Sequence, residues 1–274
     1  MKPIILLPTD FSNNSIVAMK YAQGLANYLN ADIHILHAYK AFVTAFQSKI
    51  VNEADAYRAK YEAEVDMKKF LAKFTEQEIN IFTTSIIEGN LVDVIQHYES
   101  INPLTLIIMG THGSSVPRKN ILGSNSYDIA KNTNTPLLIV PENNKGFKMD
   151  KLIFFTDYQN QDNKVFEIFK YIFKPKNIIC TMVHITHERY DEEYKKLKDW
   201  VNNLSKTNNM QLESKLVLNQ EKINVVNEII EELQADLCLL TLIERRNFFE
   251  RLFSKSLARK IILNPKVPIL LNLG

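Results

Sequence analysis

Short apolar runs alternate with longer mixed segments along the whole chain. Runs such as 4–8, 104–109 and 236–241 are hydrophobic at almost every position instead of alternating polar and apolar residues. Strands of a parallel sheet that helices cover on both faces show this pattern. The segments between the runs have the length and composition of helices, so the chain is predicted to consist of right-handed βαβ units.

The same order of elements occurs twice. Each copy begins with a run that ends in Thr-Asp, and a histidine follows each aspartate after 27 residues, from Asp10 to His37 and from Asp157 to His184. Each copy then continues through a charged helical stretch, a strand, a helix and an apolar run, and it closes on a strand introduced by a proline. Agreement of so many elements in the same order indicates an internal repeat.

The repeat predicts the fold class. Residues 1–145 and 150–274 are each expected to form a doubly wound, Rossmann-like α/β domain with a mainly parallel five-stranded sheet flanked by helices. A polar stretch around Gly146 is predicted to join them. In such sheets ligands bind beyond the carboxyl ends of the strands, where the strand order reverses. The residues that follow strands are therefore the candidates for a site.

Charge and cysteine content narrow the function classes. The 33 basic residues are nearly balanced by 31 acidic ones, and the net charge of +2 gives no support for binding nucleic acid. Cys180 and Cys238 lie inside apolar runs without a CxxC pair, so we expect buried thiols in a reducing compartment and no metal site. No apolar run approaches the ~20 residues of a membrane span, and the N-terminal run is too short for a signal sequence. A cytoplasmic protein without membrane contact is predicted.

Three of the seven glycines, Gly110, Gly113 and Gly123, lie in one loop between an apolar run and a helical segment. Glycine lets backbone amides approach a phosphate closely, and the start of a helix attracts negative charge. Hydroxyls at Ser124 and Ser126 would add donors. The spacing is neither that of a Walker loop nor GxGxxG. The alternative is that these glycines serve only as turn residues with positive φ.

The second copy serves as an internal control for these two interpretations. No glycine occurs between Gly146 and Gly274, and the corresponding loop, 240–256, is bulky and charged. The fold is therefore expected to close without these glycines. This contrast favours a ligand site in the first repeat alone.

The pattern Gly110-x2-Gly113-x9-Gly123-Ser124, with Pro-Thr-Asp-Phe-Ser at 8–12 and Pro136 before the last strand, resembles the universal stress protein family. The resemblance covers the chain as a tandem pair, strongly in the first repeat and weakly in the second. It implies that the first repeat binds ATP, with Mg²⁺ held mainly by the phosphates of the nucleotide. It also implies that the last strands of the two repeats pair as an intramolecular pseudo-dimer, with a homodimer of the whole chain as a further expectation.

The resemblance assigns a role to each matching position. Backbone and side-chain groups in the glycine loop would surround the phosphates and ribose, the residues after the first strand would lie beside the adenosine, Ala38 would meet the adenine edge, and Met109 would form an apolar wall. The predicted nucleotide-binding residues are Pro8, Thr9, Asp10, Ala38, Met109, Gly110, His112, Gly113, Gly123, Ser124, Asn125 and Ser126. Asn125 departs from the valine that the family usually has there. No catalytic residue is predicted.

Other segments leave alternatives open. Asp157 matches Asp10, but Phe253 replaces Gly123, so no nucleotide site is expected in the second repeat. Residues 244–260, with six basic and two acidic residues, are either an amphipathic helix with a solvated basic face or a contact surface. Residues 43–70 are either a lid over the adenosine or an ordinary insertion. Arg118 and Lys119 either reach phosphate or face water.

Three functions remain at this stage. The first is an ATP-binding protein of the stress response that hydrolyses ATP slowly at most, because no base or arginine pair for efficient phosphoryl transfer is evident. The second is an adenylating enzyme of related fold, which the absence of glycine at 8–12 disfavours. The third is an interaction module that binds no nucleotide.

Overall fold

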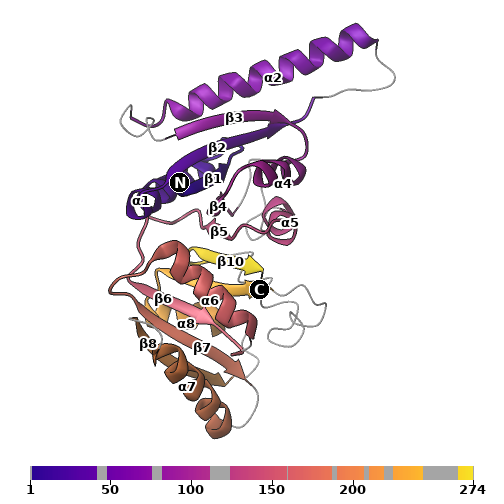
Figure 1. Cartoon of the computed structure of the whole chain (residues 1–274). Helices are drawn as coiled ribbons and strands as arrows, with labels where there is room; N and C mark the ends of the chain where they lie inside the picture. The colour runs from indigo at the N-terminus through magenta and orange to yellow at the C-terminus, as the bar shows by residue number, and fades with distance from the viewer. Residues whose placement is uncertain are drawn as a thin grey trace. The chain divides into compact units, whose positions relative to one another are not determined.

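The computed structural model of the chain describes residues 2–41, 48–75, 82–111, 124–158, 160–186, 190–206, 210–218, 225–242 and 265–273 (Figure 1). These residues form two compact units, Met1–Leu137 with Lys145–Phe147 and Leu138–Asn144 with Lys148–Gly274. Each unit is built from strands that alternate with helices. The predicted α/β fold class is therefore confirmed.

The elements of the first repeat follow in regular alternation. They are β1 (Ile4–Pro8), α1 (Asn13–Leu29), β2 (Asp32–Tyr39), α2 (Lys49–Leu71), β3 (Phe82–Glu88), α4 (Leu91–Ile101), β4 (Leu106–Gly110), α5 (Ser124–Asn132) and β5 (Leu137–Val140). Strands β3, β2, β1 and β4 lie side by side in that order, and the three pairings are parallel. The strand order thus reverses between β1 and β4, which places the carboxyl ends of these two strands at the switch point where α/β sheets bind ligands.

The second repeat has the same plan. Its elements are β6 (Lys151–Phe155), α6 (Asn160–Phe173), β7 (Ile179–Thr186), α7 (Tyr190–Lys206), β8 (Gln211–Leu218), α8 (Val225–Leu233), β9 (Leu237–Leu242) and β10 (Ile269–Leu273). The order is β10, β9, β6, β7, β8, again with parallel pairing throughout. The switch point lies between β6 and β9.

The cores follow from the apolar runs. The central strands are buried at almost every position, as the continuous hydrophobic runs predicted. Both cysteines are fully buried, and this burial raises their thiol pKa values well above the usual range. Within the described ranges, no helix combines the length and the hydropathy that crossing a membrane requires.

An aromatic residue after the last strand of the first repeat packs back onto α1. The Phe147 ring lies 5.5 Å from the rings of both Tyr21 and Tyr28. Gly24 lies beneath it, where an added Cβ atom would come within 2.5 Å of the Phe147 Cβ. Because only a bare backbone leaves this space, Gly24 allows Phe147 to seat on the helix.

Candidate functional site

The loop after β1 is held against β2 by backbone contacts. The Thr9 N–H donates to the Leu36 carbonyl at 2.9 Å, and the His37 ring nitrogen Nδ1 lies 2.7 Å from the Thr9 carbonyl. Phe11 adopts a left-handed backbone with φ of 64°, and its ring lies 4.3 Å from the His37 ring, centre to centre. These contacts fix the path of the chain between the strand and α1.

Asp10 closes the start of α1. Its Oδ1 accepts the Ser12 N–H at 3.1 Å and the Ser15 hydroxyl at 2.8 Å. Ser12 is the N-cap, and its hydroxyl accepts the Ser15 N–H at 3.3 Å. The carboxylate therefore lies at the positive end of the helix dipole, which stabilises it. The first turn of α1 contains no acidic residue of its own.

Gly110 ends β4 directly against the same helix. A Cβ atom at this position would lie 2.9 Å from the Asn14 carbonyl oxygen and 3.0 Å from the Asn14 Cβ. The close approach of β4 to α1 therefore requires a glycine at position 110, whatever the loop binds. This packing requirement was not anticipated from the sequence, where Gly110 was assigned to the ligand.

The predicted site residues that the structure describes come from three adjacent strands and one helix start. Pro8 ends β1 and Thr9 and Asp10 follow it, while Ala38 lies near the carboxyl end of the neighbouring β2. Met109 and Gly110 end β4 on the other side of β1. Ser124, Asn125 and Ser126 begin α5, with the Ser126 side chain buried. His112, Gly113 and Gly123 lie outside the described residues, as do Arg118, Lys119 and residues 244–260.

The loops after β1 and β6 have the same geometry, 147 residues apart. Phe11 and Tyr158 both have positive φ, 64° and 52°. The Phe11 N–H donates to Thr9 Oγ1 at 3.0 Å, and the Tyr158 N–H donates to Thr156 Oγ1 at 2.8 Å. Side chains in the two loops can therefore be compared position by position.

The same comparison extends to the strands that end beside these loops. Leu106 of β4 and Leu237 of β9 pair with equivalent residues of β1 and β6. Four residues further along, Gly110 of the first repeat therefore corresponds to Thr241 of the second. The glycine that leaves space beside α1 is replaced by a residue with a side chain.

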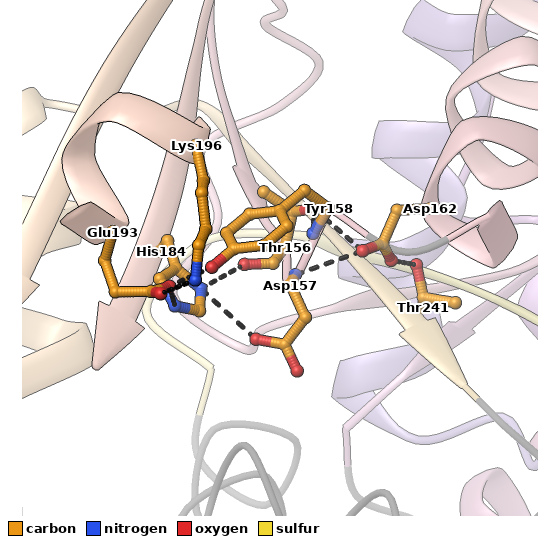
Figure 2. Close-up of polar contacts among 8 residues, drawn as sticks. All are labelled: Thr156, Asp157, Tyr158, Asp162, His184, Glu193, Lys196 and Thr241. Carbon is orange, nitrogen blue, oxygen red and sulfur yellow. Dashed lines mark hydrogen bonds and ion pairs between the residues drawn. The ribbon is translucent and has the colours of Figure 1, made fainter. Parts of the chain in front are cut away.

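In the second repeat this space holds a buried carboxylate (Figure 2). Asp162, the third residue of α6, stands where Ser15 stands in α1 and is 1% exposed. Its Oδ1 accepts the Thr241 hydroxyl at 2.6 Å. Its Oδ2 accepts the Thr156 hydroxyl at 2.7 Å and the Asp157 N–H at 3.0 Å. The donors at this edge of the second sheet are thus directed at the protein's own carboxylate.

A second polar cluster lies on the other side of the same loop (Figure 2). His184 Nδ1 lies 2.8 Å from the Thr156 carbonyl and 3.2 Å from Asp157 Oδ1, while its Nε2 lies 3.6 Å from Glu193 Oε2. Glu193 is buried in the first turn of α7, where it accepts the Tyr158 hydroxyl and, at 2.6 Å, the Lys196 ammonium. These contacts tie α7 to β7 and to the loop after β6.

Comparison with known proteins identifies the fold. The family model described as the universal stress protein family matches residues 1–141. The chain belongs to the universal stress protein family. A universal stress protein of Methanocaldococcus jannaschii is 28% identical over 144 residues, which cover 52% of this chain and 83% of that relative. A second universal stress protein of the same organism is 23% identical over 154 residues, covering 51% and 95%.

Solved structures extend the likeness beyond the first repeat. A universal stress protein from Archaeoglobus fulgidus superimposes with a TM-score of 0.73 at 17% identity, covering 98% of both chains. A functionally unknown protein from Pseudomonas aeruginosa gives 0.59 at 12% identity and covers 100% of this chain and 93% of its own. At these identities the likeness concerns the fold alone. It shows that this universal stress protein shares the fold of these solved structures over both repeats.

Sequence reasoning missed the side chains that fill the second repeat of this family member. Asp162, Thr241 and Glu193 were not singled out, although a signal for the first was present. Asp162 follows Asp157 by five residues, as Ser15 follows Asp10. Extending the repeat alignment beyond the Thr-Asp pair would have shown the exchange of a serine for a carboxylate.

The cluster around His184 predicts a pH dependence of stability. Burial lowers the pKa of His184, but its hydrogen bond to Asp157, the Thr156 carbonyl and the charges of Asp157 and Glu193 outweigh burial, so this pKa lies above the usual 6.5. Burial raises the pKa of Asp157, although His184 opposes the shift. The hydrogen bond from Lys196, and then that from Tyr158, holds the pKa of Glu193 below 4.5.

A raised histidine pKa contributes stability that is complete below pH 6.5 and is lost as the pH rises through the folded-state value. The raised pKa of Asp157 also gives a contribution to stability that is lost as the pH rises. The lowered pKa of Glu193 gives a contribution that is lost on acidification. We therefore expect the unfolding free energy of the second repeat to fall as the pH rises above 6.5. Urea unfolding followed by the fluorescence of Trp200, the single tryptophan and a residue of α7, measures it. His184→Gln should flatten the profile, and an unchanged slope in that variant would contradict the assignment.

Proposed function

We propose that the first repeat binds ATP at the carboxyl ends of β1, β2 and β4, and that the chain acts in the cytoplasm as a nucleotide-dependent module of the stress response. The observation that carries the proposal is the difference between two loops of the same geometry. Beside its loop the first repeat has Gly110 and Ser15, whereas the second has Thr241 and Asp162. In the second repeat, the start of α6 places the buried carboxylate of Asp162 at this edge. The first turn of α1 in the first repeat has no acidic residue.

The chemistry of the first edge suits a phosphate chain. The helices α1 and α5 follow β1 and β4, and helix starts offer N–H donors and a positive dipole end to anions. Glycines at 110, 113 and 123 would let the backbone approach the phosphates, with hydroxyl donors from Ser124 and Ser126. Ala38, beside β1 at the end of β2, would meet the adenine edge, and His112 and Asn125 would contact the nucleotide from the loop and the start of α5.

Mg²⁺ would be bound chiefly by the phosphates. Asp10 is the one carboxylate predicted at the site, and its Oδ1 already accepts two hydrogen bonds from the start of α1. A single carboxylate is a weak Mg²⁺ site without additional oxygen ligands. We also infer that hydrolysis is slow, because His37, the histidine beside the loop, has its Nδ1 on the Thr9 carbonyl and orients the backbone. The role proposed is therefore binding rather than turnover.

Calorimetric titration with ATP and Mg²⁺ tests the proposal. The intact chain should bind one ATP per chain, and the double variant Gly113→Val with Gly123→Val should lose this binding, because valine side chains would occupy the space that the phosphates need. Circular dichroism and the thermal midpoint of the variant serve as the control for folding. A stoichiometry of two would place a second site in the second repeat.

Two results would favour the competing functions. No heat of binding from the intact chain would reduce the loop glycines to turn residues and favour an interaction module. Release of AMP and pyrophosphate would identify an adenylating enzyme. We further propose, from the family resemblance, that the last strands of the two repeats pair within one chain.

A further inference from the structure

The first half of α2 contains no fully buried residue. Ala63, Met67 and Phe70 are its buried residues, and all three lie in the last nine residues of Lys49–Leu71. Figure 1 shows the later part of the helix beside β3 and its first turns extending beyond the carboxyl end of that strand. Packing against the core of the first repeat therefore does not account for the turns from Lys49 to about Tyr61.

The corresponding helix of the second repeat is shorter and is attached from its start. α7 has 17 residues, compared with 23 in α2. Its buried residues begin with Glu193, in the first turn, and continue to Val201. The fold thus closes with a helix that lacks the extra turns. The additional length of α2 is a property of the first repeat alone.

These extra turns carry an exposed apolar stripe. Ile50, Tyr57 and Tyr61 are 78%, 75% and 58% exposed, and Ala54 is exposed as well. The four positions are spaced by four, three and four residues, which places them on one side of a helix. This is the a/d spacing of a coiled-coil seam. Free tyrosine and isoleucine side chains in such a row mark a contact surface.

We infer that this stripe is a homotypic contact in which α2 packs antiparallel against α2 of a second copy of the chain. The spacings of four, three and four residues are the same from either end of the stripe. Two antiparallel helices can therefore place each stripe residue opposite a stripe residue of the other copy. Ile50 would then face the second copy's residue 61, and Ala54 would face its residue 57, a large side chain against a smaller one in each layer. A parallel pair would instead stack tyrosine on tyrosine and alanine on alanine, which leaves volumes unmatched.

The charges that flank the stripe also fit a second copy. Glu53 and Lys60 occupy the two g positions of the seam, if Ala54 and Tyr61 are the a positions. In an antiparallel pair, g positions lie beside the g positions of the partner helix, and opposite charges there set orientation and partner choice. Glu53 of each copy would meet residue 60 of the other, giving two ion pairs by symmetry. Among the described residues of its own helix, Glu53 forms only the long 3.7 Å ion pair with Lys49.

Sedimentation velocity between about 1 and 100 µM, without nucleotide, tests the contact. The intact chain should associate with rising concentration, and Tyr57→Glu should abolish the association because it places a charge in the seam. Tyr171→Glu, the same change at an 81% exposed tyrosine of α6, should leave it intact. All these side chains are exposed, so the variants should fold as the intact chain does. Association that survives Tyr57→Glu would overturn the proposal, as would a chain that stays monomeric throughout.

A charge exchange tests the antiparallel register. Lys60→Glu should weaken association roughly tenfold, because each new glutamate would face Glu53 of the other copy. The double variant Glu53→Lys with Lys60→Glu should restore it, since the pair is reversed in both copies at once. Failure of the double variant to recover would overturn the register. Because neither position belongs to the proposed nucleotide site, ATP titration of the same variants separates this inference from the proposed function.

Discussion

Ser15→Asp is expected to weaken ATP binding at least about a hundredfold, or about 3 kcal/mol, while the chain stays folded. The Ser15 hydroxyl lies 2.8 Å from Asp10 Oδ1 at the start of α1. A carboxylate there would add a negative charge beside Asp10, at the edge proposed to receive phosphates. The substitution reproduces Asp162, which fills the equivalent place in the second repeat.

The helix should tolerate this change. Position 15 is the third residue of α1, and acidic residues in the first turn are stabilised by the helix dipole. Ser15→Asn is the matched control, because it has nearly the same shape without the charge and should keep most of the affinity. Calorimetry with ATP and Mg²⁺ on the two variants measures the difference. Equal affinities for the two would mean that phosphates do not approach α1.

Asp162→Ala is expected to destabilise the second repeat by about 3–5 kcal/mol. Alanine would remove the acceptor of the Thr156 and Thr241 hydroxyls and of the Asp157 N–H, in a place that is 1% exposed. Three donors would then be buried without the group they point to. Such a loss is among the large effects of single substitutions, because each donor has been taken out of water.

Asp162→Asn provides the comparison. Its amide oxygen can keep the two donors that share Oδ2, and the Thr241 hydroxyl can rotate to accept from the amide nitrogen. We expect it to cost about 1 kcal/mol. Urea unfolding followed by Trp200 fluorescence reports on this repeat, since the indole donates to Asn163 of α6 at 3.0 Å. If alanine and asparagine have similar small effects, the three hydrogen bonds contribute little to stability.

The sequence predicted the fold class because the fold depends on patterns that recur along the chain. Continuous apolar runs indicated strands covered on both faces, and the spacing from Asp10 to His37 and from Asp157 to His184 indicated a repeat. The structure shows why the histidine recurs. In each repeat its Nδ1 meets the carbonyl of the threonine after the first strand, at 2.7 and 2.8 Å.

The side chains at the two sites were harder to predict, because they depend on contacts between residues far apart in sequence. From the sequence alone, position 110 could require glycine because a ligand binds there or because the Asn14 backbone leaves no room for a side chain. Nothing near Gly110 in the sequence distinguishes the two reasons. Thr241 lies 79 residues from Asp162, and nothing local to either indicates that they bond. The proposed ATP site itself remains a prediction from the glycine pattern and the family resemblance.

The seating of Phe147 on α1 has a consequence for exchanging the repeats as modules. Leu138–Asn144 group with the second unit, yet Lys145–Phe147, which follow them, group with the first. No single peptide bond therefore divides the chain into its two units. A gene fragment that ended with the family match at residue 141 would leave Tyr21 and Gly24 without the aromatic ring that covers them. Duplication or recombination at that boundary would have to carry the aromatic residue along, or find another to replace it.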